Sequence, residues 1–237
     1  MTRSQPGAAQ LLAALTDAGI AAVALPVLDI ETVTPVNGDV LKALDCFALV
    51  IFVSIHAVHS GMPMIEAIWR EPPQEPRWLA VGDATAAALA ARGVAARVPE
   101  PQSSDGILAL PETVAVAGRR VLIVAGEGGR GDLQQALQQR GATVERLVVY
   151  RRVPVRRCDE LSEMRDSLVA VVISSADGGR AFAALWEAAG GSREIPLVVP
   201  SARAAAAMRA LRFGTVVTSA GAGSAAVIEA LQSMFED

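Results

Sequence analysis

The chain has 237 residues, of which 52% are hydrophobic and 19% are charged, so it is far too apolar to remain disordered. Only 4% of the residues are aromatic, and the 45 alanines indicate a core built from Ala, Val and Leu. The formal net charge of -4 argues against a nucleic-acid-binding protein, because such proteins usually carry a basic excess. The length suits one large domain or two small ones.

The two cysteines, Cys46 and Cys158, lie far apart and form no Cys-x-x-Cys pair, which disfavours a zinc site or a disulfide framework. This cysteine usage favours the reducing cytoplasm. We expect no signal peptide, and we expect no membrane span because Gly, Asp, Arg or Pro interrupts each long apolar run. His56 and His59 have a spacing that metal ligands use, but no third histidine or cysteine is near them, so we expect no metal site.

Short apolar runs typical of buried parallel strands recur along the chain. They cover residues 48–54, 78–81, 120–125, 144–150, 169–174 and 197–199. Ala- and Leu-rich runs typical of helices cover residues 8–18, 85–92, 133–140 and 204–213, and each ends at a glycine that suits a left-handed helix cap: Gly19, Gly93, Gly141 and Gly214. The alternation predicts an α/β fold with parallel sheets flanked by helices.

The order of these segments predicts two similar lobes, of which the first is discontinuous. A strand that ends in serine and leads into a helix occurs at Ser54 and again at residues 174–175. Two other units also occur twice: a strand followed by an Ala-rich helix, a glycine and a second strand, and a glycine-containing turn followed by a helix and a strand. We therefore expect lobe one at residues 1–28 and 157–237, lobe two at residues 43–148, and a two-stranded crossing at residues 29–42 and 149–156. Chance repetition within an ordinary α/β protein is the alternative. A cleft between two lobes is the usual place for a binding site.

Residues 126–131 read Gly-Glu-Gly-Gly-Arg-Gly between a predicted strand and a predicted helix, which is the context of a dinucleotide-binding turn. Backbone N–H groups at such a helix start attract anions. A dinucleotide turn normally follows the first strand of its sheet and is followed by an acidic residue, whereas Arg151 and Arg152 stand at the corresponding strand end here. The turn is therefore compatible with NADP, with another anion, or with a purely structural role.

Several polar residues follow the predicted strands, at the edge where parallel sheets bind ligands. They are Ser54, Asp83, Thr85, Ser174, Ser175 and Ser201. Capping of the next helix explains them equally well. Tyr150, the single tyrosine, ends a predicted strand at the crossing, where a phenol can donate a proton; a half-buried core tyrosine is the alternative. Since no catalytic triad or carboxylate pair is evident, an enzyme with this sequence would act mainly by orienting a reactive substrate.

Taken in order, these segments resemble the uroporphyrinogen-III synthase family over essentially the whole chain. The matching segments are Thr2-Arg3, residues 25–28, 52–58, 81–86 and 101–111, the turn at 126–130 with Gly141, Val149-Tyr150, Ser174-Ser175 and residues 199–203. The resemblance implies a lyase of haem biosynthesis that closes the linear polycarboxylate hydroxymethylbilane to uroporphyrinogen III, with inversion of ring D and loss of water. It also implies no cofactor, no metal, no nucleic-acid or membrane partner, and a monomer.

The same resemblance implies roles for individual residues. Tyr150 is expected to assist departure of the substrate hydroxyl. The expected substrate-binding residues are Arg3, Ser54, Thr85, Gly128, Gly129, Arg130, Ser175 and Ser201, and the glycine turn becomes a cradle for carboxylates.

Two alternatives stay open from the sequence. A non-catalytic ligand-binding or sensor domain of the same fold is one, because Ala125 stands where the family often has arginine and the strand that usually precedes Thr-Arg is missing. An NADP-dependent oxidoreductase is the other, because of the glycine turn with Arg151 and Arg152.

Overall fold

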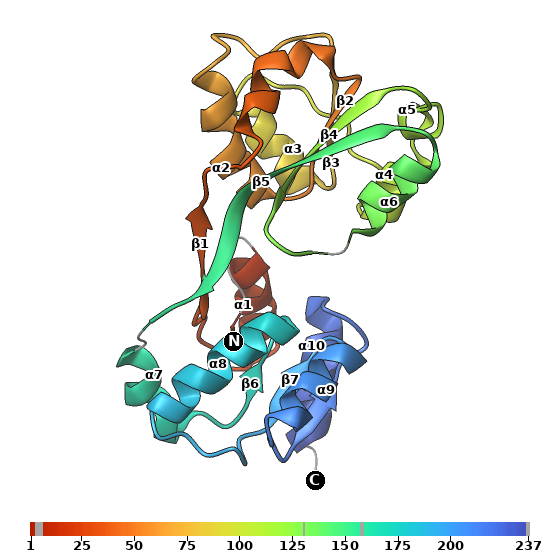
Figure 1. Ribbon diagram of the computed structural model, residues 1–237. Coiled ribbons are helices and arrows are strands. Elements are labelled where there is room, and N and C mark those ends of the chain that lie inside the picture. Colours follow the sequence, from red (N-terminus) through yellow and green to blue (C-terminus); the bar gives the residue numbers. More distant parts are fainter. Residues whose placement is uncertain (3–6, 130, 157–158, 236–237) are drawn as a thin grey trace. The chain divides into compact units, whose positions relative to one another are not determined.

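The computed structural model describes residues 1–2, 7–129, 131–156 and 159–235. It divides into two compact units, each described here by itself: unit 1 comprises Met1–Asp29 and Val153–Asp237, and unit 2 comprises Ile30–Arg152. Helices flank strands in both units (Figure 1), which confirms the predicted α/β class. Within the described residues, no helix combines the length and apolar character that crossing a membrane requires.

The described part of unit 2 is built on a five-stranded sheet with the order β1-β5-β4-β2-β3. Its elements are β1 (Leu28–Thr32), the 3₁₀ helix η1 (Gly38–Cys46), β2 (Leu49–Phe52), α2 (Ile55–Glu66), β3 (Arg77–Ala80), α3 (Asp83–Ala90), α4 (Ser104–Ala109), α5 (Pro111–Val114), β4 (Arg120–Gly126), α6 (Asp132–Gln139) and β5 (Thr143–Pro154). Strand β2 pairs in parallel with β3 and β4, and β4 pairs in parallel with β5.

Strands β1 and β5 both extend across the boundary between the units. The Val33 N–H donates to the Val149 carbonyl (3.0 Å), and the Val155 N–H donates to the Val27 carbonyl (3.1 Å). This pattern is that of an antiparallel pair. Strand β5 therefore continues past Tyr150, through residues that the sequence assigned to the crossing.

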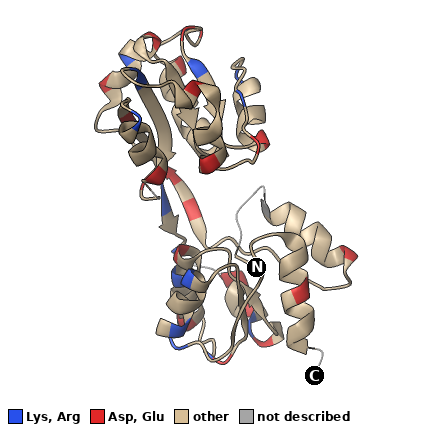
Figure 2. Cartoon of the chain, turned by 90° about the vertical axis from the view of Figure 1, so that its right-hand side faces the viewer, with Lys and Arg blue, Asp and Glu red and all other residues tan. Residues whose placement is uncertain are grey.

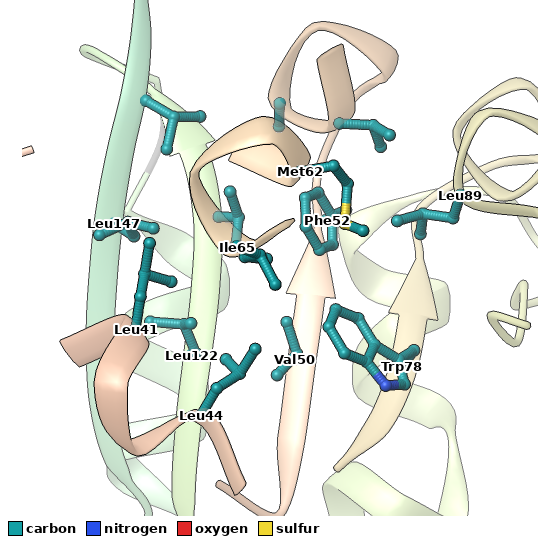
Figure 3. Close-up of a cluster of buried hydrophobic side chains, with 14 of the residues drawn as sticks. Leu41, Leu44, Val50, Phe52, Met62, Ile65, Trp78, Leu89, Leu122 and Leu147 are labelled. Carbon is teal, nitrogen blue, oxygen red and sulfur yellow. The ribbon is translucent and has the colours of Figure 1, made fainter. Parts of the chain in front are cut away.

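The central strands β2 and β4 are nearly continuously apolar because helices cover both faces of the sheet there. Val50 and Phe52 of β2 point to one face, where side chains of η1 and α2 pack with Trp78 (Figure 3). Leu49 and Ile51, the alternate residues of β2, belong to a cluster on the other face with α4 and α6. Both clusters consist of fully or nearly fully buried side chains, so they account for the strand signals that the sequence shows.

The described part of unit 1 contains a three-stranded parallel sheet with the order β6-β7-β8. Its elements are α1 (Gly7–Asp17), α7 (Asp159–Met164), the 3₁₀ helix η2 (Arg165–Ser167), β6 (Val171–Val172), α8 (Ala176–Ala188), β7 (Leu197–Val199), α9 (Ala202–Ala210), β8 (Val216–Thr218) and α10 (Ser224–Phe235). Leu197 and Val199 pack in the cluster that includes α8 and α9, whereas Val198 packs in the cluster that includes α1 and α10.

The first two residues lie beside β6. The Thr2 N–H donates to the Val172 carbonyl (3.0 Å), and the Leu25 N–H donates to the Met1 carbonyl (2.8 Å). Met1 and Thr2 thus lie between β6 and the extended segment at residues 23–25. Burial lowers the pKa of the Met1 α-ammonium group to about 6.

Three of the predicted helix caps have the expected conformation, and one does not. Gly19, Gly93 and Gly141 have φ angles of 73°, 76° and 84°, in the left-handed region. The prediction for Gly214 was wrong: the left-handed residue after α9 is Arg212, with φ of 64°. The helix ends earlier than predicted, because the Phe213 N–H returns to the Met208 carbonyl (3.3 Å) and places Arg212 at the cap.

Candidate functional site

An open pocket of about 210 Å³ lies at the carboxyl ends of β2 and β4 in unit 2. It is lined by Val53, Ser54, Ser104, Ile123, Ala125, Gly126, Glu127, Gly128, Gly129, Gly131, Leu133, Gln134, Arg146, Tyr150 and Arg152. The carboxyl edge of a parallel sheet is where α/β proteins bind ligands, because strand ends and helix starts converge there.

The glycine turn forms one wall of this pocket. Gly128 and Gly129 adopt φ angles of 71° and 81°, which favour glycine. The Arg146 guanidinium, from β5, donates to the Gly126 carbonyl (2.7 Å) and to the Gly128 carbonyl. A side chain of a neighbouring strand therefore holds two carbonyls of the turn, the Glu127 N–H donates to the Tyr150 carbonyl, and the N–H groups of Gly128 and Gly129 are left for other partners.

Tyr150 is buried, with 3% of its surface exposed, and its hydroxyl lies 3.1 Å from Ser54 Oγ. Ser54 Oγ also accepts a hydrogen bond from the Ala57 N–H (3.1 Å) and so caps α2. The His56 ring meets the Tyr150 ring edge-on, with centroids 5.8 Å apart. The Arg152 guanidinium lies 5.8 Å from the Tyr150 ring centroid.

The charges around the pocket are mixed. Arg146, Arg152 and Glu127 line it, and Arg151 pairs with Glu31 at 2.9 Å. No carboxylate among the described residues forms an ion pair with Arg152, whose side chain is exposed. Figure 2 shows basic and acidic residues interspersed in both units, so local geometry decides what the pocket attracts.

The imidazole of His56 is held in its neutral form. Partial burial lowers its pKa below the usual 6.5, and the nearby positive charge of Arg152 and the neighbouring His59 lower it further. His56 therefore adds a polar but uncharged ring beside Tyr150 at neutral pH.

The pocket brings together four of the predicted site residues: Ser54, Gly128, Gly129 and Tyr150. Thr85 is not among the lining residues; it is buried in the first turn of α3, where its N–H donates to the Gly82 carbonyl (3.0 Å). Helix α3 packs against α2, and Thr85 is buried within unit 2. Arg3 and Arg130 lie outside the described residues. The functional roles of all these residues stay predictions.

Ser175 and Ser201 belong to unit 1, and each caps a helix. Ser175 Oγ accepts from the Gly178 N–H (3.1 Å), and Ser201 Oγ accepts from the Ala204 N–H (3.3 Å). A narrow, largely apolar hollow of about 10 Å³, about the space of one water molecule, lies at the carboxyl ends of the unit 1 strands, and Ser174 and Ser219 line it.

Two functional candidates were not assigned to the site from the sequence. Arg146 received no role, and Gly126 was noted only as a member of the glycine motif. The available signal was the position of Arg146, a charged residue, within the predicted strand at residues 144–150, since the carboxyl edge of a parallel sheet is where ligands bind. Among the described residues, no three His, Cys, Asp or Glu side chains gather in an arrangement suited to a metal ion.

Comparison with known proteins identifies the family of this chain. The family model described as "Uroporphyrinogen-III synthase HemD" matches residues 9–229. The chain belongs to the uroporphyrinogen-III synthase family. The resemblance seen in the sequence is thereby confirmed, and the family spans both units.

Curated relatives carry the same name. The uroporphyrinogen-III synthase of Salmonella typhimurium is 34% identical over 156 residues, which are 64% of this chain and 63% of that protein. The chain thus matches somewhat less than two thirds of the length of that relative. The uroporphyrinogen-III synthase of Escherichia coli K12 is 30% identical over 190 residues, which are 78% of this chain and 77% of that protein.

Solved structures of the same fold are similar at low sequence identity. The uroporphyrinogen-III synthetase of Helicobacter pylori 26695 superposes with a TM-score of 0.64 at 13% identity, covering 89% of this chain and 92% of that one. A mutant uroporphyrinogen III synthase from Thermus thermophilus gives a TM-score of 0.52 at 21% identity, covering 96% and 93%. These likenesses establish the fold.

Proposed function

We propose that this protein is a uroporphyrinogen-III synthase, which closes hydroxymethylbilane to uroporphyrinogen III with inversion of ring D and loss of water. The observation that carries the proposal is the buried Tyr150–Ser54 hydroxyl pair beside the glycine turn, in a chain that the family model matches over residues 9–229. A proton donor and a cradle for anions are the two features that this reaction requires of its enzyme.

The hydrogen bonds around Ser54 suggest how Tyr150 acts as the donor. The Ala57 N–H occupies one lone pair of Ser54 Oγ, so the Ser54 O–H is free to donate to Tyr150 Oη. The phenolic proton of Tyr150 then points away from Ser54, toward the pocket. When the substrate C–O bond breaks, Tyr150 gives this proton to the departing hydroxyl, which leaves as water.

Bond breaking leaves an electrophilic azafulvene on the first ring. The substituted α-carbon of ring D attacks the methylene carbon of this azafulvene and forms a spiro intermediate, which fragments and recloses in the inverted sense. The last ring carbon then loses a proton, and the Tyr150 phenolate accepts it. The sum is substrate to product plus water, so no electrons are gained or lost and the reaction needs no redox cofactor.

The substrate is a polycarboxylate, and we propose that the glycine turn and Arg152 bind part of it. Backbone N–H groups at Gly128 and Gly129 and an exposed guanidinium are suited to carboxylate oxygens. We retain Arg3, Thr85, Arg130, Ser175 and Ser201 as proposed substrate contacts. Holding the linear substrate in a folded conformation makes the closure with ring D inverted faster than the spontaneous closure without inversion.

We further propose that the protein acts as a monomer in the cytoplasm, on a small molecule and without a nucleic-acid partner. The free, exposed thiol of Cys46 supports a reducing compartment. Light scattering of the purified protein tests the monomer: a mass near 24.6 kDa is expected, and a multiple of it would contradict the proposal.

The decisive experiment supplies freshly prepared hydroxymethylbilane and separates the porphyrin isomers after oxidation. We expect isomer III to dominate with the protein present and isomer I in its absence. Isomer I alone, at the rate seen without protein, would overturn the proposal in favour of a non-catalytic binding domain. Tight binding of NADPH in a titration would instead support the oxidoreductase alternative.

Replacing the proposed proton donor tests its role. Tyr150→Phe keeps the ring and removes the hydroxyl, so we expect kcat to fall by about a hundredfold, the usual scale for a general acid, with KM changed less than about twofold. Steady-state kinetics on isomer III formation measures both constants. The control is Arg70→Gln, a change at an exposed residue that follows α2. An unchanged kcat for Tyr150→Phe would remove Tyr150 from the mechanism.

A further inference from the structure

Gly126 lies directly opposite Tyr150 in the sheet, and the phenol ring covers it. Gly126 pairs with Tyr150 in the register of β4 and β5. A Cβ atom at position 126 would lie 2.4 Å from Tyr150 Cζ, 2.6 Å from Cε2 and 2.9 Å from Cε1. Real Cβ contacts are essentially never shorter than 3.0 Å. The ring therefore occupies the space that any other residue at position 126 would fill.

Backbone conformation does not explain the glycine at this position. Gly128 and Gly129 of the same turn have φ angles in the left-handed region, but Gly126 does not. An alanine could therefore adopt the backbone angles of Gly126. The close approach of the Tyr150 ring is what excludes a side chain there.

A bulge in β5 creates this approach. Ala125 pairs with Val148 but Gly126 pairs with Tyr150, so Val149 is an extra residue in β5. The Glu127 N–H donates to the Tyr150 carbonyl (2.7 Å) and closes the irregular pairing. Regular alternation beyond Val148 would place the side chain of residue 150 on the opposite face of the sheet, and the bulge instead places it on the face of Gly126.

We propose that Gly126 is a positioning residue for the hydroxyl of Tyr150. The glycine, the bulge at Val149 and the hydroxyl of Ser54 together form a seat that fixes the ring on one face and the hydroxyl at its tip. This inference rests on the proposed function only for its effect on turnover. The seat itself is a property of the fold and can be measured separately.

A methyl group at position 126 displaces the ring. The nearest ring atom must move by about 1 Å to reach ordinary van der Waals distance from the methyl group. Because Gly126 belongs to the buried strand β4, whose backbone is fixed by its neighbours, the ring moves rather than the backbone. Such a movement stretches the 3.1 Å contact with Ser54 beyond hydrogen-bond range. A misplacement of about 1 Å costs on the order of a hundredfold in rate when the displaced group takes part in the reaction.

The test is Gly126→Ala, with Gly38→Ala as the matched control. A Cβ at Gly38 meets nothing within 4 Å, its φ is not left-handed, and it lies in unit 2 outside the pocket. We expect Gly126→Ala to lower kcat at least about tenfold while KM changes less than about threefold. Gly38→Ala is expected to keep both constants.

A double-mutant cycle separates positioning from a general structural defect. In the Tyr150→Phe background, where the hydroxyl is gone, Gly126→Ala is expected to lower kcat by less than about twofold more. An equal loss of kcat in both backgrounds would show that Gly126 does not act through the hydroxyl, and would overturn the proposal.

Tyr150 is the only tyrosine in the chain, so a ¹³Cζ-labelled tyrosine gives a single NMR resonance that reports on the seat without any activity. We expect this resonance to shift in Gly126→Ala and in Ser54→Gly, and to stay in place in Gly38→Ala. If Tyr150→Phe leaves turnover unchanged, the proposed mechanism fails, yet the resonance still decides whether Gly126 seats the ring. A resonance unmoved by Gly126→Ala would overturn the seat itself.

If Gly126→Ala does not fold, removing the ring answers the same question. The double variant Gly126→Ala/Tyr150→Leu is expected to recover the melting temperature of Tyr150→Leu alone, because the clash partner is absent. A double variant that remains unfolded while Tyr150→Leu folds would show that the methyl group clashes with something other than the ring.

Discussion

At the scale of single residues, one hydroxyl performs two functions that the sequence left as alternatives. Ser54 Oγ caps α2 through the Ala57 N–H and also contacts the hydroxyl of Tyr150, both at 3.1 Å. A serine oxygen has enough lone pairs and a proton for both interactions, so a capping role and a site role do not compete. In the described structure Ser175 and Ser201 show the capping interaction, and their substrate contacts stay proposals.

His56 gives a prediction for stability against pH. Its pKa is lowered in the folded protein, so the unfolded chain holds the proton more tightly and protonation favours unfolding. Stability is therefore present above the usual pKa of 6.5 and is lost as the pH falls through and below it. We expect the melting temperature to drop between about pH 7.5 and about pH 5.5, and to drop less in His56→Gln.

Thermal unfolding followed by circular dichroism at several pH values measures this difference. The Met1 α-ammonium group, whose pKa is lowered to about 6 by burial, acts in the same direction in both proteins and leaves a residual slope. Parallel curves for the native protein and His56→Gln would contradict the prediction.

At the scale of secondary-structure elements, the ends and irregularities matter more than the regular parts. Helix α9 places Arg212 in the left-handed region two residues before Gly214, and a Cβ at Gly214 would meet only the exposed, flexible end of Glu194. The bulge at Val149 in β5 likewise changes which face Tyr150 reaches. In both cases a shift of one or two residues along the chain changes the position of a side chain: which residue ends the helix, and which face of the sheet the tyrosine reaches.

The strained cap of α9 yields a stability prediction. Arg212→Gly removes the Cβ that disfavours φ of 64°, so we expect the free energy of unfolding to rise by about 0.5–1 kcal/mol. Urea denaturation gives this difference. Arg212→Ala is the matched control, because it removes the charge but keeps the Cβ, and it is expected to bring no gain. Equal effects of the two changes would rule out relief of backbone strain.

At the scale of the whole molecule, the net charge of -4 and a polycarboxylate substrate need not conflict. The chain has 20 arginines and a single lysine, and Arg146 and Arg152 line the unit 2 pocket. A net charge describes the field at a distance, whereas a guanidinium in the pocket acts at contact range. Binding is then governed by the local arginines.

Added salt changes KM in opposite directions for long-range repulsion and for attraction by the pocket arginines. If long-range repulsion governed binding, added salt would lower KM; if the pocket arginines govern it, added salt raises KM. We expect KM to rise with ionic strength, and Arg152→Gln to raise KM at low salt by about threefold to tenfold and to flatten its salt dependence. Arg70→Gln is the control, since this exposed arginine follows α2 and does not line the pocket. A KM that falls with salt in the native protein would reject the local explanation.

Much of the fold was predictable because its signals are local. Buried strands read as continuous apolar runs, and glycine in the left-handed region marks where α1, α3 and α6 end. The sequence also placed Ser54 before a helix, whereas its placement of Tyr150 at a strand end was wrong because β5 continues to Pro154. It missed the length of β5, because that strand is extended by pairing with β1, a partner distant in sequence.

By itself, then, the sequence determined the α/β class, the segments that contain β2 to β4, β6 and β7 and the first part of β5, the glycine ends of α1, α3 and α6, and the family. The tertiary structure alone decided that Tyr150 lies on Gly126 and against Ser54, that Arg146 holds the glycine turn, and that Thr85 does not line the pocket. The physical reason is that periodicity and turn residues act between near neighbours along the chain. Contacts across a sheet depend on strand register, and a single extra residue such as Val149 changes the register.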